Sequence, residues 1–131
     1  MEKILDSYAL LAYLEEESGY STVESLFVNA IEKNTKLLIT TVNWGEVFYK
    51  VLRMDGKERA LDVEKMIDTF PIKIVDIDRR IAREAANFKA WKRMSYADCF
   101  AAALTKINSG ELITGDKEFK EVEKEIKIIW I

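Results

Sequence analysis

Short apolar segments alternate along the chain with longer segments in which apolar residues recur every three or four positions. The short segments indicate buried strands because each is only three to five residues long and flanked by polar or turn-forming residues. The predicted strands are Lys3–Leu5, Lys36–Thr40, Ile72–Val75, Glu111–Thr114 and Ile126–Trp130. The predicted helices are Ser7–Glu17, Ser21–Asn34, Thr41 to about Asp55, a segment through Ala60–Ile67, Asp78 to about Trp91, Tyr96–Ile107 and a short helix from Asp116 through Val122. This alternation predicts a three-layer α/β domain with a central, mostly parallel sheet of about five strands, flanked by helices.

Composition fits one domain over residues 1–131, since 49% of the residues are apolar and 33% are charged. No apolar run reaches the roughly 20 residues that span a bilayer, and the N-terminal residues lack the pattern of a secretory signal. Cys99 is the only cysteine, so no disulfide can form within the chain. We therefore expect a cytoplasmic protein with no membrane partner.

Charge and histidine content narrow the chemistry. The net charge is −3, so overall positive charge cannot attract nucleic acid to this chain. The sequence contains no histidine, which removes the commonest general base and the commonest zinc ligand. An enzyme with this composition must use carboxylates, lysines, hydroxyls or a bound metal.

Four acidic residues lie at or near the ends of predicted strands. Asp6 directly follows the first strand, and Asp116 follows the fourth strand after one intervening residue. Glu46 lies one to two turns into the helix after the second strand, and Asp98 lies in the first turn of the helix before the fourth strand. Open parallel sheets bind ligands beyond the carboxyl ends of their strands, so these acids are candidate site residues.

Each acid also has a purely structural explanation. Asp6 and Asp116 stand where helix N-caps are expected. Asp98 follows Ser95 at the spacing of a capping box. Glu46 can pair with Lys50 one helical turn away.

The neighbours of two of the acids favour a shared site instead. Asp98 lies in the apolar segment Ala97–Ala103, and Glu46 lies among Val42, Trp44, Val47 and Phe48. Buried acids are costly unless they are paired or bind a metal. Carboxylates without histidine suit Mg²⁺ or Mn²⁺ better than zinc. Next to Glu46, Gly45 is expected to let another backbone approach closely.

Four blocks around these acids resemble the PIN domain family, and most closely its VapC toxin branch. The blocks, in the family's order, are Ile4–Ala12, Thr40–Val47, Ser95–Ala103 and Leu112–Phe119. The resemblance implies four metal-binding catalytic acids, namely Asp6, Glu46, Asp98 and Asp116. It also implies two supporting polar groups, Ser7 and Thr114. The sequence departs from the usual pattern at Cys99 and Gly115, and neither departure removes an acid.

The resemblance further implies a PIN-like sheet and a Mg²⁺- or Mn²⁺-dependent endoribonuclease that hydrolyses RNA phosphodiester bonds. The VapC branch implies the toxin of a type II toxin-antitoxin pair, with a homodimer and a cognate antitoxin protein as partners. The alternative is a non-catalytic PIN-like module that binds RNA or protein. A phosphoacceptor receiver or an aspartate-nucleophile phosphatase fits less well, because Asp6 is followed by Ser7-Tyr8 and not by a second acid at the required spacing. The sequence leaves the choice between RNA and DNA open.

Several cations and aromatic residues receive structural interpretations. The cations at Lys89, Lys92 and Arg93 suit a helix C-terminus, although contact with RNA phosphates is an alternative. Arginines at positions 79, 80 and 83 are expected to be solvated surface. The three tryptophans at positions 44, 91 and 130 are expected to pack in the core or at an interface, with base stacking as the alternative. A stripe on one predicted helix, Leu26, Phe27, Ala30 and Ile31, is expected to be core, with part of a partner groove as the alternative.

Overall fold

A computed structural model describes all of residues 1–131. Its centre is a five-stranded sheet in the order β3-β2-β1-β4-β5, and every pair of neighbouring strands is parallel. The strands are β1 (Lys3–Leu5), β2 (Leu37–Thr40), β3 (Ile72–Val75), β4 (Glu111–Thr114) and β5 (Lys127–Trp130). The predicted sheet is confirmed, with all of its strands parallel.

Helices connect the strands, and most of their predicted positions are confirmed. They are α1 (Ser7–Leu14), α2 (Tyr20–Glu32), α3 (Thr41–Asp55), α4 (Lys57–Thr69), α5 (Arg79–Trp91), α6 (Tyr96–Ile107) and a 3₁₀ helix, η1 (Lys117–Val122). The first helix ends three residues earlier than predicted, because Glu15 caps it and Glu16 has a positive φ of 51°. The short helix after β4 is 3₁₀ and not α-helical.

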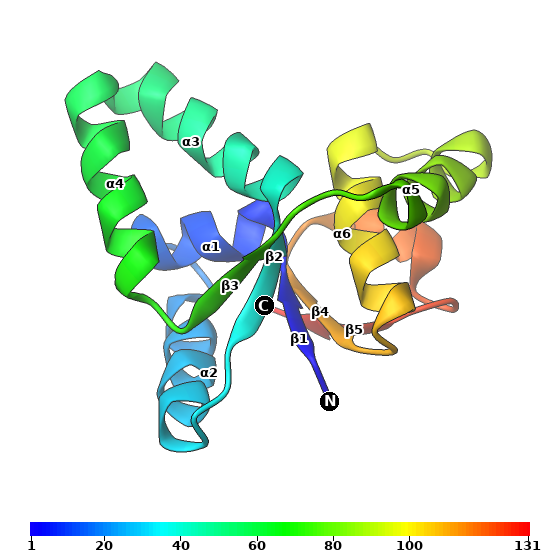
Figure 1. Cartoon of the computed structure of the whole chain (residues 1–131), viewed down its shortest axis with the longest axis horizontal. Helices are drawn as coiled ribbons and strands as arrows, with labels where there is room; N and C mark the ends of the chain where they lie inside the picture. Colours follow the sequence, from blue (N-terminus) through cyan, green and yellow to red (C-terminus); the bar gives the residue numbers. More distant parts are fainter.

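The sheet separates two apolar cores, and adjacent strand residues supply opposite cores. Ile4 and Leu112 face α5, α6 and η1, while Leu5 and Ile113 face α1, α2, α3 and α4. Figure 1 shows these two groups of helices on opposite sides of the sheet. All four of these strand side chains are fully buried, and each contributes about 1.5–3 kcal/mol to stability.

Strand order places a crevice above β1. The chain builds outward from β1 through β2 to β3, then returns to pair β4 with the other side of β1. Ile4 is opposite Leu38 of β2 and also opposite Leu112 of β4. The carboxyl ends of β1, β2 and β4 therefore meet at the point where the strand order reverses, where α/β proteins bind ligands.

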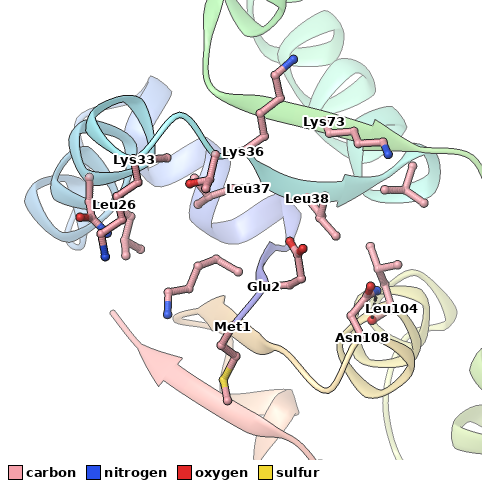
Figure 2. Close-up of a pocket in the computed structure, with 15 residues that line it drawn as sticks. Met1, Glu2, Leu26, Lys33, Lys36, Leu37, Leu38, Lys73, Leu104 and Asn108 are labelled. Carbon is pink, nitrogen blue, oxygen red and sulfur yellow. Dashed lines mark hydrogen bonds between the residues drawn. The ribbon is translucent and has the colours of Figure 1, made fainter.

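A second cavity lies at the opposite end of the sheet, around the amino ends of β1, β2 and β3. Its volume is about 880 Å³, and Figure 2 shows Leu37 and Leu38 of β2 between the end of α2 and the last turns of α6. Its wall carries four lysines and one acid, Glu2. Lysine at an exposed edge strand, such as Lys73 of β3, also prevents pairing with other chains. This cavity has none of the predicted site residues.

Some packing predictions are wrong. Trp91 is 85% exposed and Trp130 is 41% exposed, so packing in the core is wrong for both, and packing at an interface stays a prediction; Trp44 is half-buried and stacks on Phe48. In the stripe of residues 26–31, the side chain of Ile31 is 66% exposed. Sequence periodicity identifies the apolar face of a helix, but it does not show which residues of that face are covered by other elements. No helix of the structure has the length and apolar character that a membrane crossing requires.

Candidate active site

Asp6 is held rigidly at the end of β1. Its Oδ1 accepts a hydrogen bond from the Ala9 backbone N–H at 2.8 Å, which caps α1. Its Oδ2 accepts a hydrogen bond from the Thr114 hydroxyl, at the end of β4. Asp6 is 1% exposed and Thr114 is fully buried. The carboxylate therefore serves as a helix cap and joins the two central strands at the crevice.

Asp98 and Asp116 approach each other from α6 and from the end of β4. The Ser95 hydroxyl caps α6 by accepting a hydrogen bond from the Asp98 N–H at 3.2 Å, which leaves the Asp98 carboxylate free of this role. Asp116 donates its N–H to the Thr114 hydroxyl and accepts the Glu118 N–H through Oδ1, each at 2.9 Å. Carboxylate oxygens of Asp98, Asp116 and Glu118 all lie within 4.8 Å of one another.

Glu46 reaches the same pocket from α3. Its side chain is 15% exposed, and its Oε2 lies 3.7 Å from the Lys50 ammonium one turn further along α3. The pairing with Lys50 proposed as a structural explanation is present. Lys50 also lines the pocket, so this pair is part of the site.

Asn43 connects the helix that carries Glu46 to the helix that carries Asp98. Its Oδ1 accepts the Thr40 hydroxyl at 2.6 Å, and its Nδ2 donates to the Ala97 carbonyl at 3.1 Å. The same Nδ2 lies 3.5 Å from Glu46 Oε1. Because Asn43 is fully buried, these bonds fix α3 against the first turn of α6.

The acids surround one pocket of about 340 Å³ at the carboxyl end of the sheet. Its lining is largely polar and includes these residues: Ser7, Glu46, Lys50, Ser95, Asp98, Asp116 and Glu118. Asp6 and Thr114 are not in the lining, but the Thr114 hydroxyl joins them to it: it donates to Asp6 and accepts the N–H of Asp116, which does line the pocket. Of the two expected supporting residues, Ser7 faces the pocket and Thr114 anchors Asp6.

The electrostatics indicate uncompensated negative charge. Burial, together with the charges of Asp116, Asp6, Glu118 and Glu46, raises the pKa of Asp98 to about 8. Burial also raises the pKa of Asp6 to about 7, with contributions from Asp116 and Glu46, although the hydrogen bonds from Thr114 and Ala9 act in the opposite direction. These shared effects show that the four predicted acids are close enough to repel one another.

Three site residues were not predicted. Glu118 is two residues after Asp116, a spacing that a 3₁₀ helix turns toward the same pocket. Asn43 is three residues before Glu46, and only the contact with Ala97 reveals its role. Lys50 was predicted only as an ion-pair partner. Glu118 and Lys50 could have been predicted from the sequence, because each is a charged residue two or four positions after a candidate acid.

The two glycines that precede site acids have different surroundings. A Cβ at Gly45 would meet no atom within 4 Å, so the expected close approach of another backbone is wrong. A Cβ at Gly115 would lie 2.3 Å from the Tyr8 ring and 2.9 Å from the Ile131 carbonyl. Gly115 is therefore required for close packing directly before Asp116.

The donor atoms suit a hard divalent cation. The pocket presents carboxylate and hydroxyl oxygens, and it contains no thiol because Cys99 does not line it. Mg²⁺ and Mn²⁺ prefer such oxygen ligands. Lys50 is the one cation in the lining, which also contains five acids: Glu17, Glu46, Asp98, Asp116 and Glu118. A divalent ion would compensate the charge that now raises the pKa values of Asp6 and Asp98.

Comparison with solved structures shows the same fold. The VapBC complex of Salmonella typhimurium bound to DNA matches with a TM-score of 0.80 and 16% identity, over 98% of this chain and 97% of that chain. VapBC2 of Rickettsia felis, bound to a promoter DNA fragment, matches with a TM-score of 0.78 and 16% identity, over 100% and 99% of the two chains. VapC20 of Mycobacterium tuberculosis, a toxin that cleaves the sarcin-ricin loop, matches with a TM-score of 0.73 and 13% identity, over 91% and 93%.

Sequence comparison assigns the family. No curated protein matches the sequence. The PIN domain family model matches residues 3–125, which include every acid that the structure gathers at the pocket. On this match, and with the parallel sheet and structural neighbours described above, the chain belongs to the PIN domain family.

Proposed function

We propose that residues 1–131 act as one nuclease domain, a Mg²⁺- or Mn²⁺-dependent endoribonuclease that hydrolyses RNA phosphodiester bonds. The observation that supports this most strongly is the gathering of acids from four separate segments around one pocket. A purely structural role does not explain so many carboxylates in one place, because like charges close together destabilise the folded protein.

The residues that would hold the metal are Asp6, Glu46, Asp98 and Asp116, with Glu118 as an additional oxygen donor. When bound, the metal would supply a Lewis acid for the phosphate and a water of lowered pKa. Asp98, Asp116 and Glu118 offer oxygens close enough to share one ion. Each carboxylate oxygen of Asp6 accepts one hydrogen bond, and the acceptor positions that remain can still serve a metal ion.

Residues around the acids would position the substrate. Lys50 stands in the lining and can bind a phosphate oxygen of the RNA. Ser7 and Ser95 present hydroxyl groups to the same pocket. Asn43 holds α3 and α6 in register, so Glu46 and Asp98 keep their separation as substrate enters.

The proposed reaction is attack of water on phosphorus with cleavage of the bond between phosphorus and the 3′ oxygen. A proton goes from the water to solvent or to a carboxylate, and a proton returns to the leaving 3′ oxygen. The products carry 5′-phosphate and 3′-hydroxyl ends. A route through the 2′ hydroxyl is disfavoured, because the chain has no histidine for the two proton transfers.

The biological partner in this proposal is a cognate antitoxin, with the chain as the toxin of a type II pair. The proposal is supported by the structural neighbours, several of which are toxin-antitoxin complexes. The protein is further proposed to form a homodimer. Sedimentation velocity tests the dimer, and co-expression with a small protein encoded next to it tests the antitoxin.

The decisive experiment compares acid-to-amide variants at the pocket with a matched variant elsewhere. Asp98→Asn and Asp116→Asn should each lower RNA cleavage by about 100-fold or more and abolish the heat of Mn²⁺ binding in calorimetry without RNA. Asp62→Asn, on the exposed face of α4, makes the same charge change and should preserve both signals. EDTA should stop cleavage by the wild-type protein.

The outcomes separate the two functions considered. A cleavage rate in Asp98→Asn equal to that of the wild-type protein would refute the proposed site. Calorimetric Mn²⁺ binding without cleavage of any RNA would instead favour the non-catalytic PIN-like module.

A further inference from the structure

Helix α5 concentrates positive charge in a chain whose net charge is negative. Residues 79–93 contain six cations and one acid, whereas the whole chain has a net charge of −3. The cations are Arg79, Arg80, Arg83, Lys89, Lys92 and Arg93. Figure 1 shows α5 beside α6 at the edge of the molecule.

Two of these cations have structural partners, and the arginines do not. Lys89 donates a hydrogen bond to the Met94 carbonyl at 2.7 Å, and Lys92 pairs with Glu125 at 3.2 Å. None of the four ion pairs of the structure involves an arginine. Arg79 and Arg80 also stand in the first turn of α5, where the helix dipole disfavours cations. Helix stability therefore does not explain the arginines.

Helical spacing places four side chains on one exposed stripe, here called the α5 stripe: Arg80, Arg83, Asn87 and Trp91. The buried face of α5 carries Ile81, Ala85 and Phe88, and the stripe points away from it. From Arg80 to Trp91 the stripe is about 16 Å long, at a rise of about 1.5 Å per residue. That length can follow several phosphates of a nucleic acid strand.

Trp91 is the most exposed large apolar side chain of the protein, at 85%. It borders a hollow of about 440 Å³, together with Asn87, Lys92 and Lys106. Two acids also line this hollow, but each is paired with a lysine: Glu84 with Lys106 at 3.1 Å and Glu125 with Lys92 at 3.2 Å. The hollow thus offers an aromatic face without unpaired negative charge.

The stripe ends close to the acid pocket. Ser95, which lines the pocket, is four positions after Trp91, so the two Cα atoms are at most about 14 Å apart. The connecting segment is fastened to the 3₁₀ helix, because the N–H groups of Arg93 and Ser95 donate to Glu121 and Glu118, each at 3.0 Å. These bonds hold the end of α5, which carries Trp91, close to the site.

We infer that the α5 stripe binds single-stranded RNA and leads it into the acid pocket, with phosphates on Arg80 and Arg83 and a base stacked on Trp91. This inference rests on the proposed nuclease function. The pocket repels RNA through its carboxylates, so cations a short distance away must supply the attraction. A second copy of the chain is a poorer occupant, because a symmetric contact would bring the arginines of two stripes together.

The test measures RNA binding separately from cleavage. The full chain carrying Asp98→Asn serves as the parent, and fluorescence anisotropy follows a labelled single-stranded RNA in Mg²⁺ at several salt concentrations. In this parent, Trp91→Ala should weaken binding about 5- to 100-fold through loss of base stacking. The pair Arg80→Ala and Arg83→Ala should weaken binding and reduce the slope of log K against log salt by about 1.4.

The matched control removes two other exposed cations. Lys57→Ala with Lys65→Ala makes the same charge change on α4, away from the stripe, and should leave affinity within about 2-fold and the salt slope unchanged. Sedimentation velocity accompanies each variant. The inference is supported if Trp91→Ala weakens RNA binding while the oligomeric state stays that of the parent.

Several results would overturn the inference. These are a parent that does not bind the RNA, equal affinities for the parent and the stripe variants, or an altered oligomeric state in Trp91→Ala with RNA affinity unchanged. The last result would assign the stripe to self-association. Cleavage by the wild-type chain is measured in parallel, so a protein that binds RNA through the stripe without cleaving it contradicts the nuclease proposal alone.

Discussion

Asp6 shows how one side chain can be both structural and functional. Its carboxylate caps α1 and accepts the Thr114 hydroxyl, so both oxygens already have partners. A carboxylate has about four acceptor positions, and these two bonds leave others available. The structural and functional explanations of the acids are thus compatible, and the presence of a cap does not argue against a site.

The raised pKa values predict how the stability of the metal-free protein depends on pH. Asp6 and Asp98 have folded pKa values of about 7 and about 8, against 3.8 for an ordinary aspartate. Between pH 4 and pH 8 the folded protein therefore binds more protons than the unfolded chain. Their contribution to stability is complete below about pH 4 and is lost as the pH rises through 7 to 8. Urea denaturation in EDTA at pH 5, 6.5 and 8 should show this decline.

The variant Asp98→Asn isolates one of these groups. At pH 8 it should stabilise the metal-free protein by about 1 kcal/mol or more, because it removes a buried charge among like charges. At pH 5 the gain should be smaller, since Asp98 is then protonated in the folded protein. A gain that is equal at both pH values would contradict the assigned pKa, and Asp62→Asn provides the control.

Two glycines beside site acids predict opposite effects of alanine. Gly45→Ala should stabilise the protein by about 0.5–1 kcal/mol, because the new Cβ meets open space and helix propensity improves. Gly115→Ala should destabilise it by about 1–3 kcal/mol, because the Cβ overlaps the Tyr8 ring and the Ile131 carbonyl. Thermal unfolding of the two variants measures this contrast, and a loss of stability in Gly45→Ala would show an unseen contact.

At the scale of elements, the first turns of α3 and α6 form the frame of the site. Thr40 and Ser95 cap these helices through their hydroxyl oxygens. Asn43 then joins the two helices through the Ala97 carbonyl at 3.1 Å. Caps fix where each helix begins, and the Asn43 bond fixes how far Glu46 lies from Asp98.

Asn43→Ala should therefore affect both stability and the site. Loss of a buried amide that serves Thr40 and Ala97 should cost about 1–3 kcal/mol. The affinity for Mn²⁺ should fall as well, because α3 is no longer held against α6. Chemical denaturation and calorimetry measure the two effects, and Thr69→Ala, which removes an exposed hydroxyl bond on α4, is the control. Unchanged Mn²⁺ affinity would exclude a positioning role for Asn43.

At the scale of the whole molecule, the negative charge at the acid pocket is not balanced by distant cations. Neither the surface ion pairs nor the four lysines of the cavity at the amino ends of the strands compensate it. Charges separated by more than a Debye length, about 8 Å at physiological salt, are largely screened. Lys50 alone lines the acid pocket as a cation. The folded protein therefore stores electrostatic repulsion that a divalent ion can relieve.

Divalent ions should raise the melting temperature of the protein, and more strongly at pH 8 than at pH 6. At a concentration of Mn²⁺ about 100 times its dissociation constant, the gain is about 2.7 kcal/mol, or roughly 5–15 °C for a domain of this size. Protons compete with the metal for Asp98 and Asp6, which reduces the gain at lower pH. Differential scanning fluorimetry checks the shift; Asp116→Asn should lose it, and an equal shift in Asp116→Asn would contradict the site.

The sequence by itself predicted most of the elements and a mostly parallel sheet, because apolar periodicity and capping residues act over a few neighbouring positions, and it singled out the four acids as candidates. Asp6 and Asp116 could be placed from their positions after strands alone. Tertiary structure decided what depends on distant contacts: the entry of Glu118 into the pocket, the bridge from Asn43 to Ala97, and the exposure of Trp91. These depend on which elements pack together, and a one-dimensional pattern does not carry that information.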